Sequence, residues 1–263
     1  MLTLGVLASG RGTDFQAIVD HVKLDVLRDV RIEILVSNME DAEVLRRADN
    51  AGIESSFIEG ISGKKFQSKE EREEKRIVFD KEVVKVFDSH KVDLIALAGF
   101  NQIVSSYLVG RFGNRIMNIH PAFDIERFGG PGMFGMKVHQ TVIDAGESIS
   151  GCTIHYVDST IDRGPVIIRA GVPVMKNDDA GLLAERVLAI EHRAYPKAIQ
   201  LHADKRIVID GRKVFLDLFS GDAWELDWKR RQERYIIHQE EEWMSRGKNL
   251  RMILGQDVSQ SHL

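Results

Sequence analysis

Short, almost wholly apolar segments alternate along this chain with amphipathic ones, and no other feature limits its possible folds as much. The segment at residues 92–98, VDLIALA, is nearly continuously apolar, which is typical of a strand buried on both faces of a parallel sheet. Similar segments at residues 2–7 and 32–36 are each followed by a stretch with helical apolar spacing. Because strands that alternate with helices form right-handed βαβ units, we expect an α/β fold with a doubly wound, mainly parallel sheet.

The chain changes character toward its C-terminal end. The dipeptide Asp-Gly at residues 210–211 is typical of a type I′ turn, which predicts a hairpin between strands at residues 206–209 and 213–216. The segment at residues 224–243 indicates a charged helix that carries aromatic side chains. The pattern of alternating strands and helices does not continue here, so this region is a separate appendage.

We therefore expect two parts, an α/β domain at residues 1–202 and a C-terminal extension at residues 203–263. In the simpler interpretation, the aromatic residues of the extension pack on the α/β domain. In the second interpretation, they form the interface of a homodimer. The run KRRQER at residues 229–234 predicts a solvated helical face, because charge runs usually face water.

Composition and charge exclude several classes of protein. The 263 residues are 43% hydrophobic, which is enough for a sizeable core, and the net charge of −4 argues against a nucleic-acid-binding surface. The single cysteine, Cys152, excludes a disulfide framework within the chain, and we expect it to be a buried apolar residue. The N-terminus lacks a signal peptide's basic region, and no segment approaches the roughly 20 apolar residues of a membrane span. We expect a cytoplasmic protein without a membrane partner.

The first polar motif, SGRGTD at residues 9–14, lies between the first strand and the first helix. Its glycines allow a sharp turn that brings backbone N–H groups against a bound anion, and the helix N-terminus adds partial positive charge. These properties suit a phosphate group. An ordinary strand-to-helix turn, with Thr13 or Asp14 as the N-cap, explains the motif equally well.

Two further motifs place polar side chains where strands end. In the strand at residues 115–120, Asn118 and His120 share one face because successive side chains alternate. Ligands of open α/β sheets bind at the carboxyl ends of strands, where this pair lies. The turn DSTIDRGP at residues 158–165 adds two carboxylates, one of which could meet His120. Taken alone, these motifs are better explained as a satisfied polar pair and an ordinary turn.

The order of the three motifs, with His155 and Asp162 ahead of Gly164 and Pro165, resembles the glycinamide ribonucleotide (phosphoribosylglycinamide) formyltransferase family. The resemblance covers residues 2–202, and its most specific part is the Asn-x-His element with the later Asp-x-Gly-Pro-Val-Ile. Further matching segments are SGRGTDFQAI, LAGF, GPGMFGMKVHQ, GCTIHYVD and EHRAYP. The resemblance implies a Rossmann-like fold and an enzyme that transfers a formyl group from a folate to the amine of glycinamide ribonucleotide, in de novo purine biosynthesis.

The resemblance also implies a role for individual residues. The catalytic side chains would be Asn118, His120 and Asp162. The phosphorylated substrate would contact residues of the glycine loop, a charged helix and the last core helix, namely Gly12, Thr13, Asp14, Arg76 and Glu191. The cosubstrate 10-formyltetrahydrofolate would lie against two segments after strands, namely Phe100, Asn101, Gln102, Ile103, Val104, Asp158 and Ile161. The chemistry requires no metal.

These side chains suit formyl transfer to an amine. An amine that attacks a formyl group creates a tetrahedral oxyanion, to which Asn118 and a protonated His120 could donate hydrogen bonds. An ionised Asp162 would favour the protonated imidazole, and it could accept the proton of the amine through a water.

The chain departs from the family pattern at several positions. Asp14 puts a carboxylate near the expected phosphate, Asn101 and Gln102 replace an apolar and a basic residue, and Arg163 could pair with the adjacent Asp162. Two alternatives therefore stay open. One is the same chemistry on another amine, such as a nucleotide-linked amino sugar. The other is a folate- or nucleotide-binding protein without catalytic activity.

Overall fold

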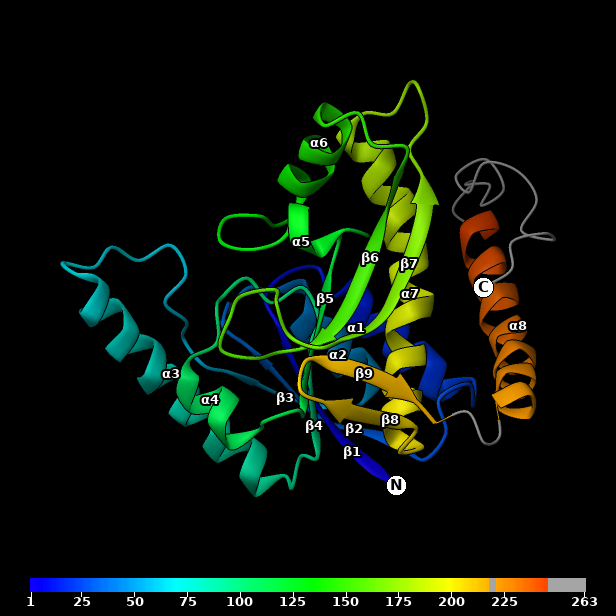
Figure 1. The fold of residues 1–263 in the computed structure, drawn as a ribbon. Helices are drawn as coiled ribbons and strands as arrows, with labels where there is room; N and C mark the ends of the chain where they lie inside the picture. The colour runs from blue at the N-terminus through cyan, green and yellow to red at the C-terminus, as the bar shows by residue number, and fades with distance from the viewer. Residues whose placement is uncertain (218–220, 246–263) are drawn as a thin grey trace.

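The computed structural model describes residues 1–217 and 221–245, and a seven-stranded sheet forms its centre (Figure 1). The strand order is β3-β2-β1-β4-β5-β6-β7, with parallel pairing from β3 to β5 and antiparallel pairing of β6 with both of its neighbours. The prediction of a doubly wound, mainly parallel sheet is confirmed. The strands are β1 (Leu2–Ala8), β2 (Val30–Ser37), β3 (Glu54–Phe57), β4 (Leu94–Leu97), β5 (Ile116–His120), β6 (Ile149–Tyr156) and β7 (Val166–Pro173).

Helices cover both faces of this sheet (Figure 1). Leu94 and Ala96 of β4 belong to the hydrophobic cluster under α1, α2, α6 and α7. Ile95 and Leu97 belong to the cluster under α3 and α4 on the opposite face, so β4 is buried on both sides as predicted. The helices are α1 (Thr13–Lys23), α2 (Glu43–Ala51), α3 (Lys69–Ser89), α4 (Ser106–Arg111), α5 (Ile125–Phe128), α6 (Met136–Asp144), α7 (Ala180–Ala203) and α8 (Gly221–Ser245).

The short helix α5 lies at the start of residues 124–136, whose four glycines and one proline predict a long, mobile loop. Asp124 caps its first turn, because the Asp124 carboxylate accepts a hydrogen bond from the backbone N–H of Arg127 at 3.1 Å. Ile125 and Phe128 are buried and hold the turn against the core. The prediction of a loop is wrong at these four residues. The glycines that follow favour a loop, but they do not indicate that Ile125 and Phe128 can be buried against the core.

The C-terminal extension forms a hairpin and a helix, as predicted. The strands β8 (Ile207–Asp210) and β9 (Lys213–Leu216) make a separate two-stranded sheet. Trp228 and Tyr235 of α8 pack on the α/β domain, which confirms the simpler interpretation of the aromatic residues. The side chain of Trp243 and residues 246–263 lie outside the described residues. The division of the chain at residue 202, and a homodimer formed through the extension, stay predictions.

The basic run at residues 229–234 is not wholly solvated. Arg231 is 4% exposed and Gln232 is 7% exposed. The Arg231 guanidinium donates a hydrogen bond to the carbonyl oxygen of Val26 at 2.5 Å. The prediction of a solvated face is wrong for these two residues, because a run of this length goes round the helix and must present some side chains to the core.

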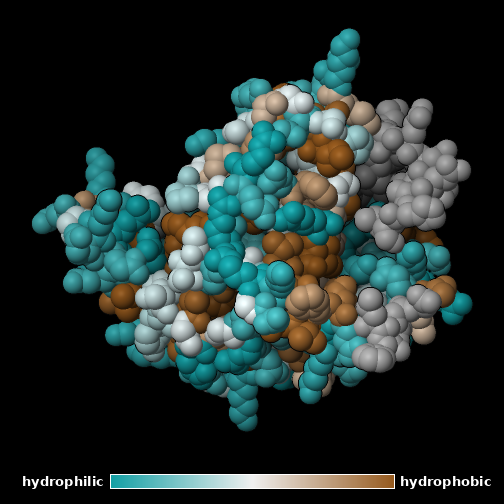
Figure 2. Space-filling model, in the orientation of Figure 1, coloured by the Kyte–Doolittle hydropathy of each residue, from teal (hydrophilic) through white to brown (hydrophobic). Residues whose placement is uncertain are grey.

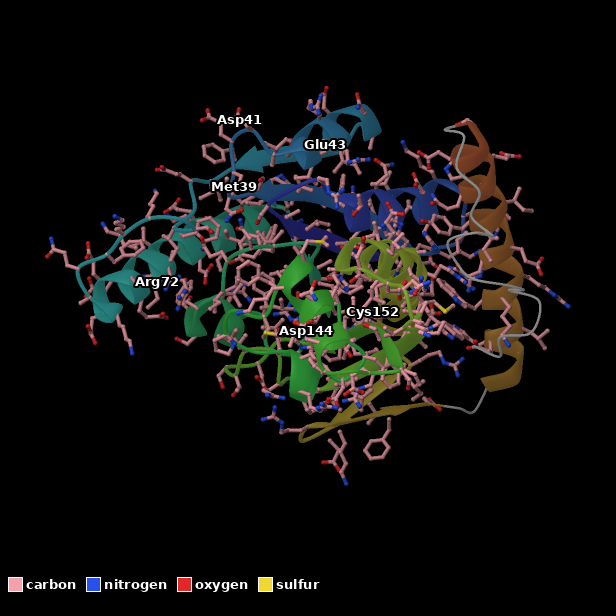
Figure 3. All side chains as sticks on the ribbon, turned by 90° about the horizontal axis from the view of Figure 1, so that it is seen from above. Met39, Asp41, Glu43, Arg72, Asp144 and Cys152 are labelled. Carbon is pink, nitrogen blue, oxygen red and sulfur yellow. The ribbon has the colours of Figure 1, made fainter. Side chains whose placement is uncertain are left out.

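Two expectations drawn from composition concern single features. Cys152 in β6 has no exposed surface, as predicted, and Figure 3 shows it inside the molecule. In the part of the chain that the structure describes, no helix is both long enough and apolar enough to cross a membrane.

The order of the strands places a ligand site at one edge of the sheet. The chain adds β2 and β3 on one side of β1 and then crosses back to add β4 on the other side, and open α/β sheets bind ligands at such a switch point. Figure 2 shows hydrophobic residues gathered across the middle of one face of the molecule, with hydrophilic surface above and below them.

Candidate active site

A cleft of about 1780 Å³ opens at the ends of β4 and β5 and at the loop that follows β1. It extends from α3, which contributes Arg72 and Arg76, to α8, which contributes Tyr235, Ile236 and Gln239. Seen from above in Figure 3, these two helices lie on opposite sides of the molecule, and Arg72 is labelled on α3. The cleft therefore crosses most of the width of the domain.

The three residues predicted to be catalytic line this cleft together. Asn118 and His120 lie on one face of β5, and Asp162 lies in the turn between β6 and β7. The Asn118 amide nitrogen is 3.5 Å from Asp162 Oδ1, and His120 Nδ1 is 3.6 Å from Asp162 Oδ2. The fold thus brings together residues that lie more than 40 positions apart in the sequence.

The Asp162 carboxylate is held in place between the other two side chains. Its Oδ2 accepts a hydrogen bond from the backbone N–H of Gly130 at 2.9 Å. The side chain is 12% exposed, and the residue has a φ of 54°, a left-handed conformation that aspartate adopts more readily than most residues. A carboxylate fixed in this way can orient the imidazole beside it.

Both ring nitrogens of His120 face oxygen atoms. Nε2 lies 2.8 Å from the carbonyl oxygen of Phe128, to which it donates, because a carbonyl can only accept. Nδ1 faces Asp162 Oδ2, and the residue is 4% exposed. Nε2 therefore carries a proton, and Nδ1 is the ring nitrogen that faces Asp162.

His155, to which the sequence assigns no role, lies directly opposite Asn118 on β6. Its Nδ1 lies 2.9 Å from the carbonyl oxygen of Tyr156, so Nδ1 carries the proton, and its Nε2 accepts from the Asn118 amide at 3.2 Å. Burial lowers the pKa of His155 and keeps the ring neutral for this contact. The Asn118 amide is thereby oriented between two partners, since the same nitrogen also donates to Asp162 Oδ1 at 3.5 Å. The alternation of side chains along β6 predicts on which face of the sheet His155 lies. Only the register between β5 and β6 shows that its partner is Asn118.

Only part of the predicted phosphate loop lines the cleft. Gly12 has a φ of 69° and is the N-cap of α1, a role that the sequence analysis gave to Thr13 or Asp14. It packs so closely on Val44 that any side chain would overlap this residue. The predicted Asp14 lines the cleft here together with Arg11, whereas Gly12 and Thr13 are not among the lining residues.

The Asp14 side chain is 11% exposed and lies beside His192, with Oδ1 of Asp14 4.0 Å from Nε2 of His192. Burial raises the pKa of Asp14 from 3.8 to about 6, and burial lowers the pKa of His192 to about 4. Near pH 7 the imidazole is therefore neutral and most of the Asp14 carboxyl is ionised. Glu191 lines the same cleft, and its burial together with the charge of Asp14 raises its pKa.

We expect Asp14→Asn to stabilise the protein at pH 7 by about 1 to 3 kcal/mol. Because folding raises the pKa of Asp14, its protonated form contributes stability below about pH 4, and this contribution is lost as the pH rises through about 6. Asparagine has no proton to lose. Urea unfolding at several pH values from about 4 to 7 measures the effect. The same change at the exposed Asp49 is the control, and a stability difference for Asp14→Asn that does not grow with pH would contradict the prediction.

The other two residues predicted to bind the substrate also line the cleft. Arg76 forms an ion pair with Glu73 one turn earlier on α3, so part of its guanidinium is occupied. Its Nε is buried without a hydrogen-bond partner in the structure as described. Glu191 is 8% exposed on α7. Arg76 and Glu191 are thus available to a ligand from two opposite helices.

The seven residues predicted to bind folate all line the cleft, namely Phe100, Asn101, Gln102, Ile103, Val104, Asp158 and Ile161. Two of them also tie loops together. Gln102 Oε1 accepts from the backbone N–H of Ile61 at 2.8 Å, and Asn101 Oδ1 accepts from the Asn38 amide at 2.9 Å. These two departures from the family pattern therefore hold the loops after β2 and β3 against the loop after β4.

Arg163 does not pair with Asp162, contrary to the alternative that the sequence raises. Its guanidinium donates to the carbonyl oxygen of Glu126 at 2.9 Å and to that of Ile125 at 3.4 Å. The two adjacent side chains diverge in the turn, so the arginine braces α5 and leaves the carboxylate facing His120. Within the described residues, no group of three His, Cys, Asp or Glu side chains is arranged to hold a metal ion.

Comparisons with known proteins point to one family. The sequence model of the family described as Formyl transferase matches residues 3–199. The phosphoribosylglycinamide formyltransferase of Escherichia coli (strain K12) is 32% identical over 216 residues, which are 82% of this chain and 94% of that protein. The crystal structure of glycinamide ribonucleotide transformylase 1 from Symbiobacterium toebii is similar with a TM-score of 0.70 at 35% identity, over 82% of this chain and 94% of that one.

Longer relatives contain a similar region. The trifunctional purine biosynthetic protein adenosine-3 of Gallus gallus is 34% identical over 226 residues, which are 86% of this chain. The matched region is 20% of that protein, so the chain spans about a fifth of the length of this curated relative. The family match ends before β8, which leaves the hairpin and α8 outside it.

Proposed function

The chain belongs to the formyl transferase family, and on this premise we propose that it transfers a formyl group from 10-formyltetrahydrofolate to the amine of glycinamide ribonucleotide, in de novo purine biosynthesis. One observation carries the proposal. Asp162 lies within 3.6 Å of both Asn118 and His120, in a cleft whose volume of about 1780 Å³ exceeds that of pockets for a single small ligand. Such a cleft can hold a donor and an acceptor at once.

In the proposed reaction two of the side chains stabilise the oxyanion and the third transfers a proton. The amine nitrogen attacks the formyl carbon, and the formyl oxygen becomes an oxyanion that accepts hydrogen bonds from Asn118 and from a protonated His120. The bond between the formyl carbon and N10 of the folate then breaks as the carbonyl re-forms. Asp162 takes the amine proton through a water, and the proton ends on N10 of the departing tetrahydrofolate.

The two substrates are proposed to occupy opposite parts of the cleft. The folate lies against residues 100–104 and the turn that carries Asp158 and Ile161, which combine apolar surface with a few polar groups. The acceptor lies toward α1 and α7, near Asp14 and Glu191. This placement brings the amine and the formyl group together at the end of β5, where the catalytic side chains lie.

The activity test is direct. Purified protein is mixed with 10-formyltetrahydrofolate and glycinamide ribonucleotide, and loss of the formyl group is followed by absorbance. We expect turnover that depends on the ribonucleotide, and a mixture without the ribonucleotide measures hydrolysis of the folate alone.

Absence of turnover from folded protein would contradict the choice of acceptor. A panel of amines that includes nucleotide-linked amino sugars then tests the alternative that the Asp14 carboxylate favours, because this group repels a phosphate dianion. Folate binding that is unchanged in His120→Ala, without turnover of any amine, would instead indicate a binding protein.

A further inference from the structure

The C-terminal helix α8 runs antiparallel to α1 and reaches the end of the cleft at which the acceptor is proposed to bind. Arg231 of α8 donates a hydrogen bond to the carbonyl oxygen of Val26, just beyond the last turn of α1. Further along α8, Ile236 and Gln239 line the cleft, as does Asp14 in the first turn of α1. A helix from outside the family match therefore forms part of the wall of the candidate site.

Tyr235 places an unpaired hydroxyl group at this wall. The residue lines the cleft, is 2% exposed, and packs its ring on His21 with the ring centroids 3.8 Å apart. Its hydroxyl is buried and has no hydrogen-bond partner among the residues that the structure describes. A buried polar group without a partner destabilises a protein, and a ligand that supplies the partner gives a reason to keep it.

The charges near Tyr235 indicate which ligand group would suit its hydroxyl. Burial and nearby carboxylates raise the pKa of Tyr235, so the hydroxyl keeps its proton and acts as a donor. Arg11 and Arg193 line the same cleft and supply positive charge, and Arg193 lies close enough to influence the Tyr235 pKa. The carboxylates nearby are Asp14 and Glu191, which line the cleft, and Asp20 and Glu242, which also raise the Tyr235 pKa. A hydroxyl donor in a cleft that also contains these two arginines suits an anionic group that offers several acceptor oxygens.

We propose that Tyr235 determines specificity for the acceptor, by donating a hydrogen bond to its phosphate group. The inference rests on the proposed function, because it needs a phosphorylated acceptor whose amine lies at Asn118. With the amine at the end of β5, the other end of the acceptor extends toward α1 and α8. The contact is an addition to the family core, since α8 lies beyond the matched residues 3–199.

Tyr235→Phe tests the contact, because phenylalanine keeps the packing on His21 and removes only the hydroxyl. We expect the KM for glycinamide ribonucleotide to rise about tenfold, since one hydrogen bond to an anion is lost from both the bound substrate and the transition state. The kcat and the KM for 10-formyltetrahydrofolate stay unchanged. The Kd of ribose 5-phosphate, measured by calorimetry, rises by the same factor. A purely structural role would change the Tm and neither constant.

Trp228→Phe is the matched control, because Trp228 packs on the same face of α8 but lies outside the lining of the cleft. It is expected to lower the Tm and leave the KM for the acceptor unchanged. An unchanged KM and Kd in Tyr235→Phe would overturn the inference. If the wild-type protein does not formylate glycinamide ribonucleotide, the proposed function fails, and ribose 5-phosphate decides the inference alone. Weaker binding by Tyr235→Phe then supports it, and equal binding, or none by the wild-type protein, overturns it.

Discussion

Asp162→Asn is expected to lower kcat by a factor of about 10² to 10⁴ while the protein stays folded. Asparagine has nearly the same shape, and its side-chain oxygen can still accept the hydrogen bond that Gly130 donates to Asp162 at 2.9 Å. The variant loses the negative charge that faces His120 Nδ1 at 3.6 Å, and it cannot take a proton from the amine. Steady-state turnover with both substrates measures the loss, and thermal unfolding reports on the fold.

The matched control makes the same change at Asp144, an exposed carboxylate of α6 that accepts a hydrogen bond from Gln140 at 2.8 Å (Figure 3). Asp144→Asn is expected to keep kcat within about twofold of the wild-type value, because exposed positions away from a site tolerate substitution. A loss of less than about tenfold in Asp162→Asn would show that this carboxylate does not take part in the transfer of the proton.

Gly164→Ala is expected to destabilise the protein by at least about 3 kcal/mol and to reduce the activity of the molecules that remain folded. A Cβ at Gly164 would overlap the carbonyl oxygen of Tyr156 and approach its carbonyl carbon to 2.8 Å. Because these contacts are with backbone at the end of β6, the turn itself must move, and Asp162 must move with it. Urea unfolding gives the loss of stability, and turnover at a temperature where the variant is folded gives the second effect.

Gly110→Ala is the control for this substitution. Gly110 lies in α4, and a Cβ there would meet nothing within 4 Å, so alanine is expected to stabilise the helix slightly. A Gly164→Ala protein as stable as the wild type would mean that the turn can shift freely. In that case the position of Asp162 beside His120 would not depend on this close approach of two backbone segments.

Much of the fold was predictable because it depends on local patterns. The apolar run at residues 92–98 is long enough and continuous enough to require burial on both faces, and β4 lies in the middle of the sheet. Asn118 and His120 share a face of β5 because alternation along a strand depends only on neighbouring residues. The motif order that resembles the formyltransferase family then predicted which distant turn would carry Asp162. The cleft contains thirteen of the fifteen residues expected to be functional, and Gly12 and Thr13 are the exceptions.

The partners of these side chains were decided by tertiary structure alone. His155 orients the Asn118 amide because β5 and β6 pair in one particular antiparallel register, which no local pattern specifies. Arg163 turns away from Asp162 because the carbonyl groups of α5 lie within its reach. Tyr235 reaches the cleft because α8 packs antiparallel to α1, although some 200 residues separate the two helices in the chain. The sequence by itself determined which residues face the same way along each strand and helix, since this follows from the geometry of neighbouring residues. Only the packing of distant segments decided what each of these side chains meets.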